Sequence, residues 1–141
     1  MTAPSDTSRT TVATRPRSAL YSALIGLASL GVLLQGVWAG MFIREGQGNN
    51  DGWVEVHARG AEITLALAVI AAIVAAVKLR SRRDVLVGSI LFVVLLAVES
   101  FIGGIVGGNP ALQTVHFPLA MALLGLAVWL PTRASRPMTM P

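Results

Sequence analysis

The sequence predicts an all-α integral membrane protein, an up-down-up-down four-helix bundle with both termini in the cytoplasm. Two observations of composition point to this class, since 54% of the 141 residues are hydrophobic and only 13% are charged. The third is the distribution of the apolar residues, which form four runs of the roughly 20 residues that a helix needs to cross a bilayer. A soluble domain of this size does not have this composition.

The four predicted membrane-spanning helices make up one transmembrane domain over residues 19–131. Residues 1–18, rich in Ser, Thr and Pro, are expected to form a disordered cytoplasmic tail, and residues 132–141 a second cytoplasmic tail. The first apolar run is longer than the 7 to 15 residues of a signal-peptide core, so it is expected to stay in the mature protein. The predicted spans are about 19–43, 55–77, 85–106 and 111–130.

Basic residues indicate the orientation. Nine of the 11 Lys and Arg residues lie in the first tail, the connection between the second and third spans, or the last tail. The two others, Arg44 and Arg59, lie on the opposite side beside acidic residues. The positive-inside rule then places both termini in the cytoplasm. The net charge of +4 is therefore interpreted as a topology signal, and no nucleic-acid partner is predicted.

Composition also excludes several kinds of functional site and indicates the kind of organism that encodes the chain. The chain has no cysteine, which excludes disulfides, thiolate metal sites and c-type heme attachment. It has no Gly-rich phosphate loop and no H-E-x-x-H site, so no enzyme of a soluble type is predicted. A single lysine against ten arginines, with abundant Ala, Gly and Val, is typical of a GC-rich bacterial genome. The expected location is the bacterial inner membrane, where the lipid bilayer is the first partner.

Four polar side chains fall inside the predicted spans at similar depths. His57 and His116 are the only histidines and lie near the starts of the second and fourth spans. Gln35 lies on the first span and Glu99 on the third. Such residues are costly in hydrocarbon and usually face the interior of a bundle, so they are the first candidates for a functional site.

Paired imidazoles on alternate helices suggest one b-type heme. In a ring of four antiparallel helices the second and fourth lie diagonally across the core. His57 and His116 could then ligate opposite axial positions of one heme iron, whose potential the protein tunes through hydrogen bonds to those ligands. The predicted cofactor-binding residues are His57, His116, Gln35, Glu99 and Arg59; the two histidines are the metal ligands, and Arg59 or Arg44 pairs with heme propionates.

Structural roles for the same residues remain open. His57 could be an interfacial histidine beside a surface pair of Glu55 and Arg59, and His116 a residue of a first helical turn. Glu99 needs a partner, and Gln35, His57 and His116 are all at a reachable depth. Glu62 should lie on a different face from His57 and pair with Arg59.

Two further patterns concern packing and the cytoplasmic surface. The pairs Gly36/Gly40 and Gly103/Gly107 have the small-xxx-small spacing of close helix contacts. The basic residues from Lys78 to Arg83 are most simply a cytoplasmic stop signal, although such a cluster can also attract anionic lipid.

The sequence resembles one half of the heme A synthase family, whose four-helix halves carry paired histidines on the second and fourth helices. The residues that carry the resemblance are Val56-His57-Ala58-Arg59, Glu99-Ser100-Phe101-Ile102-Gly103-Gly104 and Leu112-Gln113-Thr114-Val115-His116. A heme A synthase needs two halves and more than one histidine pair, so the resemblance implies heme binding rather than oxygenation of a heme methyl group. The chain also resembles an uncharacterised family of small four-helix bacterial membrane proteins, through Gln35, Ala39-Gly40, Trp53 and His116-Phe117-Pro118-Leu119-Ala120.

Three functions follow from these observations. The first is a heme b protein of electron transfer, heme handling or oxidase assembly, working with a larger membrane or respiratory complex or as a homodimer. The second is a non-heme accessory subunit or scaffold whose polar residues join the helices. The third is a proton or solute carrier that uses Glu99, but the inner halves of the spans offer no polar path for it.

Overall fold

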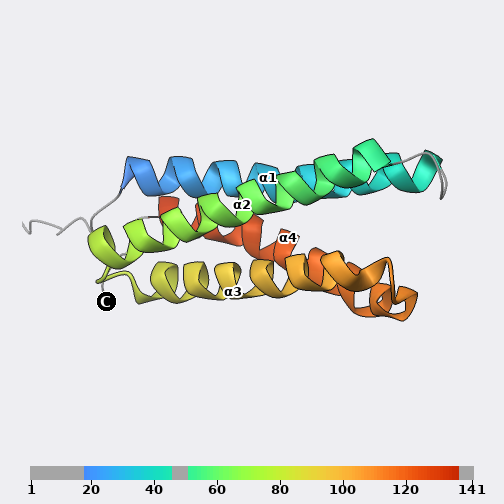
Figure 1. Cartoon of the computed structure of the whole chain (residues 1–141). Coiled ribbons are helices and arrows are strands. Elements are labelled where there is room, and N and C mark those ends of the chain that lie inside the picture. The colour runs from blue at the N-terminus through green and yellow to red at the C-terminus, as the bar shows by residue number, and fades with distance from the viewer. Residues whose placement is uncertain (1–17, 46–50, 137–141) are drawn as a thin grey trace, which may run out of the picture.

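The computed structural model describes residues 18–45 and 51–136, and nearly all of them are helical (Figure 1). A short 3-10 helix, η1 (Pro110–Leu112), precedes the last helix. Each of the four α-helices is long and apolar enough to cross a membrane, as predicted. These helices are α1 (Ala19–Glu45), α2 (Asp51–Lys78), α3 (Arg83–Val106) and α4 (Gln113–Ser135).

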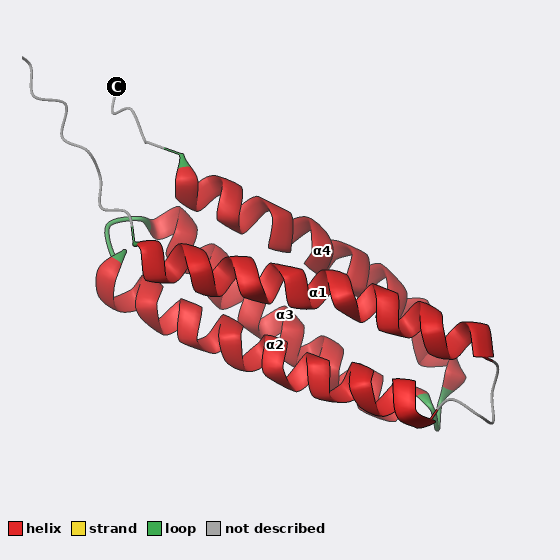
Figure 2. Cartoon of the chain, turned by 90° about the horizontal axis from the view of Figure 1, so that it is seen from above, coloured by secondary structure: helices red, strands yellow, loops and turns green. Residues whose placement is uncertain are grey.

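The four helices form a ring in which each contacts its neighbours along the chain, and α1 closes the ring by packing against α4. Within the described residues, α2 does not pack directly against α4, nor α1 against α3. Figures 1 and 2 show this arrangement from two sides, with the α2–α3 turn at one end of the bundle and η1 at the other.

One buried seam on each helix faces the centre of the ring. Its residues recur at alternating spacings of three and four, the knobs-into-holes pattern of left-handed bundles. Many of them are alanines, which let the helices approach closely. The seams are Tyr21, Ile25, Ala28 and Val32 on α1; Thr64, Ala68, Ala71 and Ala75 on α2; Val85, Ser89, Phe92, Leu96 and Glu99 on α3; and Leu123, Ala127, Leu130 and Ala134 on α4.

Large apolar side chains cover the outside of the bundle instead of its centre. Met121 is 75% exposed and Phe101 69% exposed, and exposed Leu, Ile and Val side chains follow all four helices. A soluble monomer rarely exposes contiguous apolar surface on this scale. The natural environment of this surface is lipid, so the outside of the molecule agrees with the predicted membrane protein.

The prediction that the fourth span ends near residue 130 is wrong, because α4 continues to Ser135 and includes residues of the expected tail. Pro131 has no N–H to donate to the carbonyl of Ala127, the usual reason for a helix to end. Here the Ser29 hydroxyl of α1 lies 2.6 Å from that carbonyl oxygen and 2.7 Å from the carbonyl oxygen of Ile25, so its single proton can be donated to either one. Of the predicted tails 1–18 and 132–141, residues 1–17 and 137–141 lie outside the described residues.

The extra turn of α4 is fastened by Arg82, which lies in the α2–α3 turn and is only 2% exposed. Its guanidinium donates to the carbonyl oxygen of Arg133 at 2.8 Å and to that of Ala134 at 3.4 Å. Asp84 accepts from Arg82 at 3.3 Å and from Arg133 at 2.7 Å. One buried guanidinium thus supplies donors to the last carbonyls of α4, of which that of Arg133 also accepts from the backbone N–H of Arg136 at 3.4 Å.

The close contact between α1 and α2 depends on glycines other than those predicted. A Cβ atom on Gly31 would collide with the Thr64 hydroxyl, and one on Gly60 would meet the Gln35 side chain at 2.7 Å. Gly36, Gly40 and Gly107 have open space where a Cβ would lie. The small-xxx-small pairs are therefore not helix contacts within this chain, although Gly103 packs against a histidine ring.

Candidate functional site

Both histidines line one pocket of about 710 Å³ at the end of the bundle that holds η1. His57 comes from α2 and His116 from α4, the diagonal pair of the ring, while α1 and α3 supply the remaining walls. This volume lies in the range of small-molecule and cofactor sites, roughly 300–1,000 Å³. The walls are mainly apolar and contain Phe42, Val54, Gly103, Gly104 and Phe117.

His57 lies seven residues, or two helical turns, before the buried Thr64, so the α2 seam points it inward. Its Nδ1 atom is 3.2 Å from the backbone carbonyl oxygen of Gln35 on α1. The Phe42 ring meets the imidazole edge to face, with ring centroids 5.5 Å apart. The imidazole is thus held from the α1 side.

The Gln35 side chain adds a second contact to the same histidine. When its amide nitrogen faces α2, that nitrogen lies 2.9 Å from the His57 carbonyl oxygen and 3.0 Å from His57 Nδ1. In this orientation its oxygen accepts from the backbone N–H of Ala61 at 2.9 Å. His57 Nδ1 therefore has an acceptor when it carries a proton and a donor when it does not.

His116 is positioned by α3. Its Nδ1 atom lies 3.0 Å from Oε1 of Glu99, and both side chains are more than four-fifths buried. The two groups are close but poorly aligned, and neither Glu99 oxygen has a hydrogen-bond partner among the described residues. A buried carboxylate is costly without a partner, so a proton, water or better alignment is needed here.

Gly103 packs against the His116 ring. A Cβ atom added at this glycine would lie 3.2 Å from Cε1 of His116 and 3.9 Å from Nε2. The 3.2 Å distance to Cε1 is closer than ordinary van der Waals contact, whereas the 3.9 Å distance to Nε2 is ordinary. The glycine is one turn after Glu99 on α3, so the same face of α3 supplies both the carboxylate and the space for the ring.

The arrangement leaves the same nitrogen available on each ring. The Nδ1 atoms of His57 and His116 contact a carbonyl and a carboxylate. Neither Nε2 atom has a hydrogen-bond partner in the described part of the chain, and neither is fully buried. No group of three or more His, Asp or Glu side chains there could hold a metal ion alone.

The other predicted site residues take different places. Gln35 and Glu99 each support one histidine rather than line the pocket. Arg59 lies outside the pocket, with Nε 2.7 Å from Glu55 and Nη1 3.0 Å from Glu62. Both surface pairs predicted for Arg59 are present, and all three side chains are about two-thirds exposed.

Phe42 and the particular role of Gly103 were not predicted from the sequence. The spacing of buried positions could have identified the inward faces, because Gln35 continues the α1 seam three residues after Val32 and His116 lies seven residues before Leu123. That signal is hard to detect because lipid-facing positions are as apolar as buried ones. No family model, curated protein or solved structure matches this chain.

Proposed function

We propose that this protein binds one b-type heme between α2 and α4, with His57 and His116 as its axial ligands. The observation that supports this most directly is that both imidazoles line one pocket, while Nδ1 of His57 lies 3.2 Å from the Gln35 carbonyl oxygen and Nδ1 of His116 lies 3.0 Å from the Glu99 carboxylate. Each Nε2 atom is then left for iron. Heme supplies the equatorial nitrogens and a reversible one-electron couple, which suits electron transfer, heme handling or oxidase assembly.

The contacts behind the histidines favour this function over a fortuitous pair. Metal-bound histidines almost always place the second ring nitrogen against a carbonyl or carboxylate, which fixes the tautomer and raises ligand basicity. The Gln35 carbonyl plays that part for His57, and the Glu99 carboxylate plays it for His116. The chain's own residues thereby orient both rings, and the apolar walls keep water away from the site.

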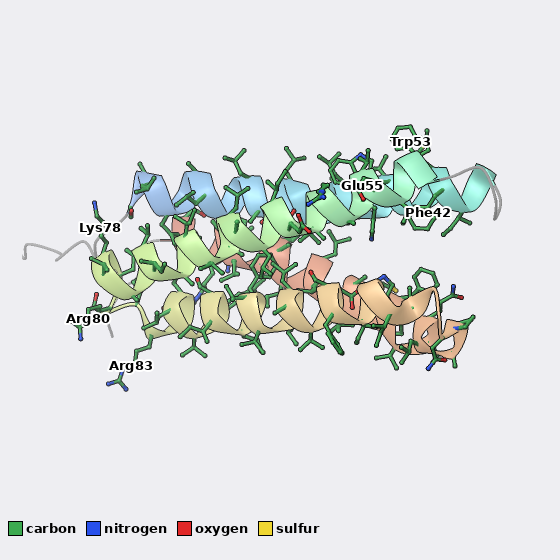
Figure 3. The ribbon with its side chains drawn as sticks, viewed as in Figure 1. Phe42, Trp53, Glu55, Lys78, Arg80 and Arg83 are labelled. Atoms are coloured by element: carbon green, nitrogen blue, oxygen red, sulfur yellow. The ribbon has the colours of Figure 1, made fainter. Side chains whose placement is uncertain are left out.

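Membrane orientation completes the proposal. An up-down-up-down bundle in a bacterial inner membrane, with both termini cytoplasmic, places the pocket in the outer half of the bilayer. Support comes from Lys78, Arg80 and Arg83, which gather at the opposite end of the bundle (Figure 3). Electron exchange at the pocket would then take place near the outer surface. No enzymatic step is proposed.

The direct test is the visible spectrum of the purified protein before and after reduction with dithionite. A Soret band and a reducible α band are expected in the wild type. His57→Ala and His116→Ala should each lose them, while Glu62→Gln, on the exposed face of α2, should keep them. His116→Gly should regain the bands when imidazole is added, since free imidazole can enter the vacated position.

A scaffold without heme is the second candidate, favoured by the polar contacts that already join helices. His57 and Gln35 tie α2 to α1, and His116 and Glu99 tie α4 to α3. This candidate predicts a colourless protein that takes up no added heme. In that case His116→Ala should lower stability, and imidazole should restore no spectral band.

A further inference from the structure

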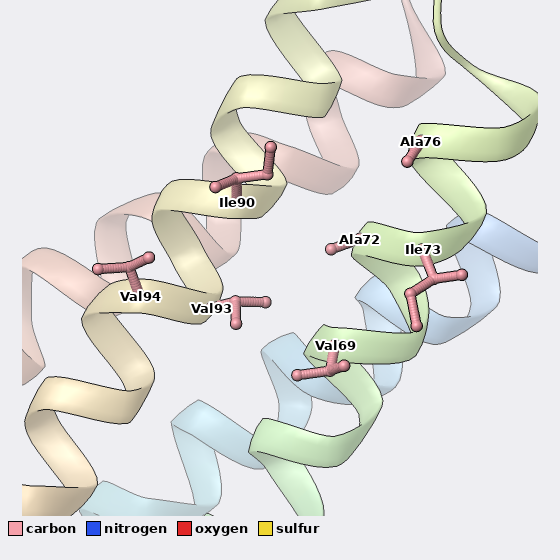
Figure 4. Close-up of a pocket in the computed structure, with 7 residues that line it drawn as sticks. All are labelled: Val69, Ala72, Ile73, Ala76, Ile90, Val93 and Val94. Atoms are coloured by element: carbon pink, nitrogen blue, oxygen red, sulfur yellow. The ribbon is translucent and has the colours of Figure 1, made fainter.

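A shallow apolar groove of about 280 Å³ runs along the outside of the bundle between α2 and α3. Its α2 side is formed by Val69, Ala72, Ile73 and Ala76, and its α3 side by Ile90, Val93 and Val94 (Figure 4). The small alanine side chains leave the space that larger residues fill elsewhere on this surface. Because the groove faces the lipid-exposed exterior, a lipid acyl chain is a natural occupant.

Basic side chains lie just beyond one end of this groove. Lys78 follows Ala76 by two residues, and Arg83 lies about 10 Å before Ile90 at 1.5 Å per residue of helix. Lys78, Arg80 and Arg83 are exposed and point away from the bundle at the α2–α3 turn (Figure 3). None of the three forms an ion pair with another described residue.

The nearest carboxylate does not cancel this positive charge. Asp84 directs its Oδ2 atom to Arg82 and to Arg133, at 3.3 and 2.7 Å. Arg82 itself is buried and donates to the end of α4. Among the described residues, Lys78, Arg80 and Arg83 therefore have no ion-pair partner and lie beyond one end of the apolar groove. A signal for membrane topology needs only the charges and no groove.

We propose that this face binds an anionic phospholipid, with its phosphate at Lys78, Arg80 and Arg83 and one acyl chain in the groove between α2 and α3. The cations attract the headgroup, and the apolar walls accept the chain without exposing a polar group. Anionic lipid of the cytoplasmic leaflet gains about fivefold in binding for each nearby Lys or Arg. The site is separate from the histidine pocket, which lies at the other end of the bundle.

The test is native mass spectrometry of the full chain released from nanodiscs of phosphatidylcholine with a tenth of phosphatidylglycerol. The wild type should retain one phosphatidylglycerol more often than the bilayer composition predicts. The triple variant Lys78→Gln, Arg80→Gln, Arg83→Gln should lose this preference by an order of magnitude or more. Equal enrichment in the triple variant would overturn the placement of the phosphate.

A second variant tests the groove itself. Ala72→Phe with Ala76→Phe should fill the groove and abolish retention of phosphatidylglycerol, although the basic residues remain. Ala66→Phe, which adds the same ring at an exposed α2 position outside the groove, should retain lipid as the wild type does. Undiminished retention by the filled variant would exclude the acyl chain from this groove. Circular dichroism and the melting temperature show that each variant is folded.

Discussion

His116 and Glu99 face each other across the α3–α4 contact, with Nδ1 of the imidazole 3.0 Å from Oε1 of the carboxylate. Both side chains are largely buried, and neither carboxylate oxygen has a hydrogen bond in the described part of the chain. A buried polar pair of this kind is costly unless its groups are hydrogen-bonded to each other, to water or to a ligand. Here the carboxylate lies behind a ring that borders the pocket.

Glu99→Gln keeps the shape of this side chain and removes its charge. If heme is bound through His116, the imidazole becomes less basic and the ferric state is less stabilised, so the midpoint potential should rise. Heme affinity should also fall by roughly tenfold, as is common when an outer-shell partner is lost. Redox potentiometry and heme titration measure both. Glu62→Gln is the matched control. An unchanged midpoint potential in Glu99→Gln would show that the carboxylate does not influence the cofactor.

Gly103→Ala tests the fit of the His116 ring. The new methyl group would lie 3.2 Å from Cε1, so the ring or α3 must shift by a few tenths of an ångström. Overpacking of this kind costs about 1–3 kcal/mol, and heme occupancy should fall with it. Gly125→Ala adds a methyl group inside α4 where nothing lies within 4 Å, so it should stabilise the protein by up to about 1 kcal/mol. Equal effects of the two substitutions in thermal unfolding would show that the ring has room to move.

The spans were predictable because apolar runs of this length have few alternatives, whereas their ends were not. Pro131 ordinarily marks the end of a helix, and only the tertiary contacts from Ser29 and Arg82 show why α4 continues. For the site, matching depths were visible in the sequence. The pairing of Glu99 with His116 and of Gln35 with His57 depends on helix rotation. Rotation is poorly encoded when lipid-facing and buried positions are both apolar.

Ser29 and Pro131 should be energetically coupled. Ser29→Ala removes the donor to the buried Ala127 carbonyl and should destabilise the protein by about 1–2 kcal/mol. Pro131→Ala restores a backbone N–H that can bond the same carbonyl within α4. In that background Ser29→Ala should cost much less. A double-mutant cycle of unfolding free energies measures the difference, and strictly additive costs would rule out compensation by the hydroxyl.

Arg82→Gln should loosen the end of α4. The guanidinium is 2% exposed and donates to the carbonyls of Arg133 and Ala134 in the last turn of α4; the Arg133 carbonyl also accepts from the backbone N–H of Arg136 at 3.4 Å. Loss of the guanidinium should lower the free energy of unfolding by on the order of 2–4 kcal/mol. The Arg133–Asp84 pair remains in the variant and makes this loss smaller. Hydrogen exchange of α4 and unfolding in lipid-free detergent report the change. Arg80→Gln removes an exposed charge and should leave both the hydrogen exchange of α4 and the free energy of unfolding unchanged.

The proposed orientation predicts opposite labelling of the two ends of the bundle. Because the chain contains no cysteine, Ser81→Cys in the α2–α3 turn and Asn109→Cys before η1 each introduce a single thiol. Both positions are exposed. A membrane-impermeant maleimide should label Asn109→Cys in right-side-out vesicles and Ser81→Cys in inverted ones. The reverse pattern would place the histidine pocket near the cytoplasm, and it would also remove the lipid site from the cytoplasmic leaflet, so this one assay constrains both sites.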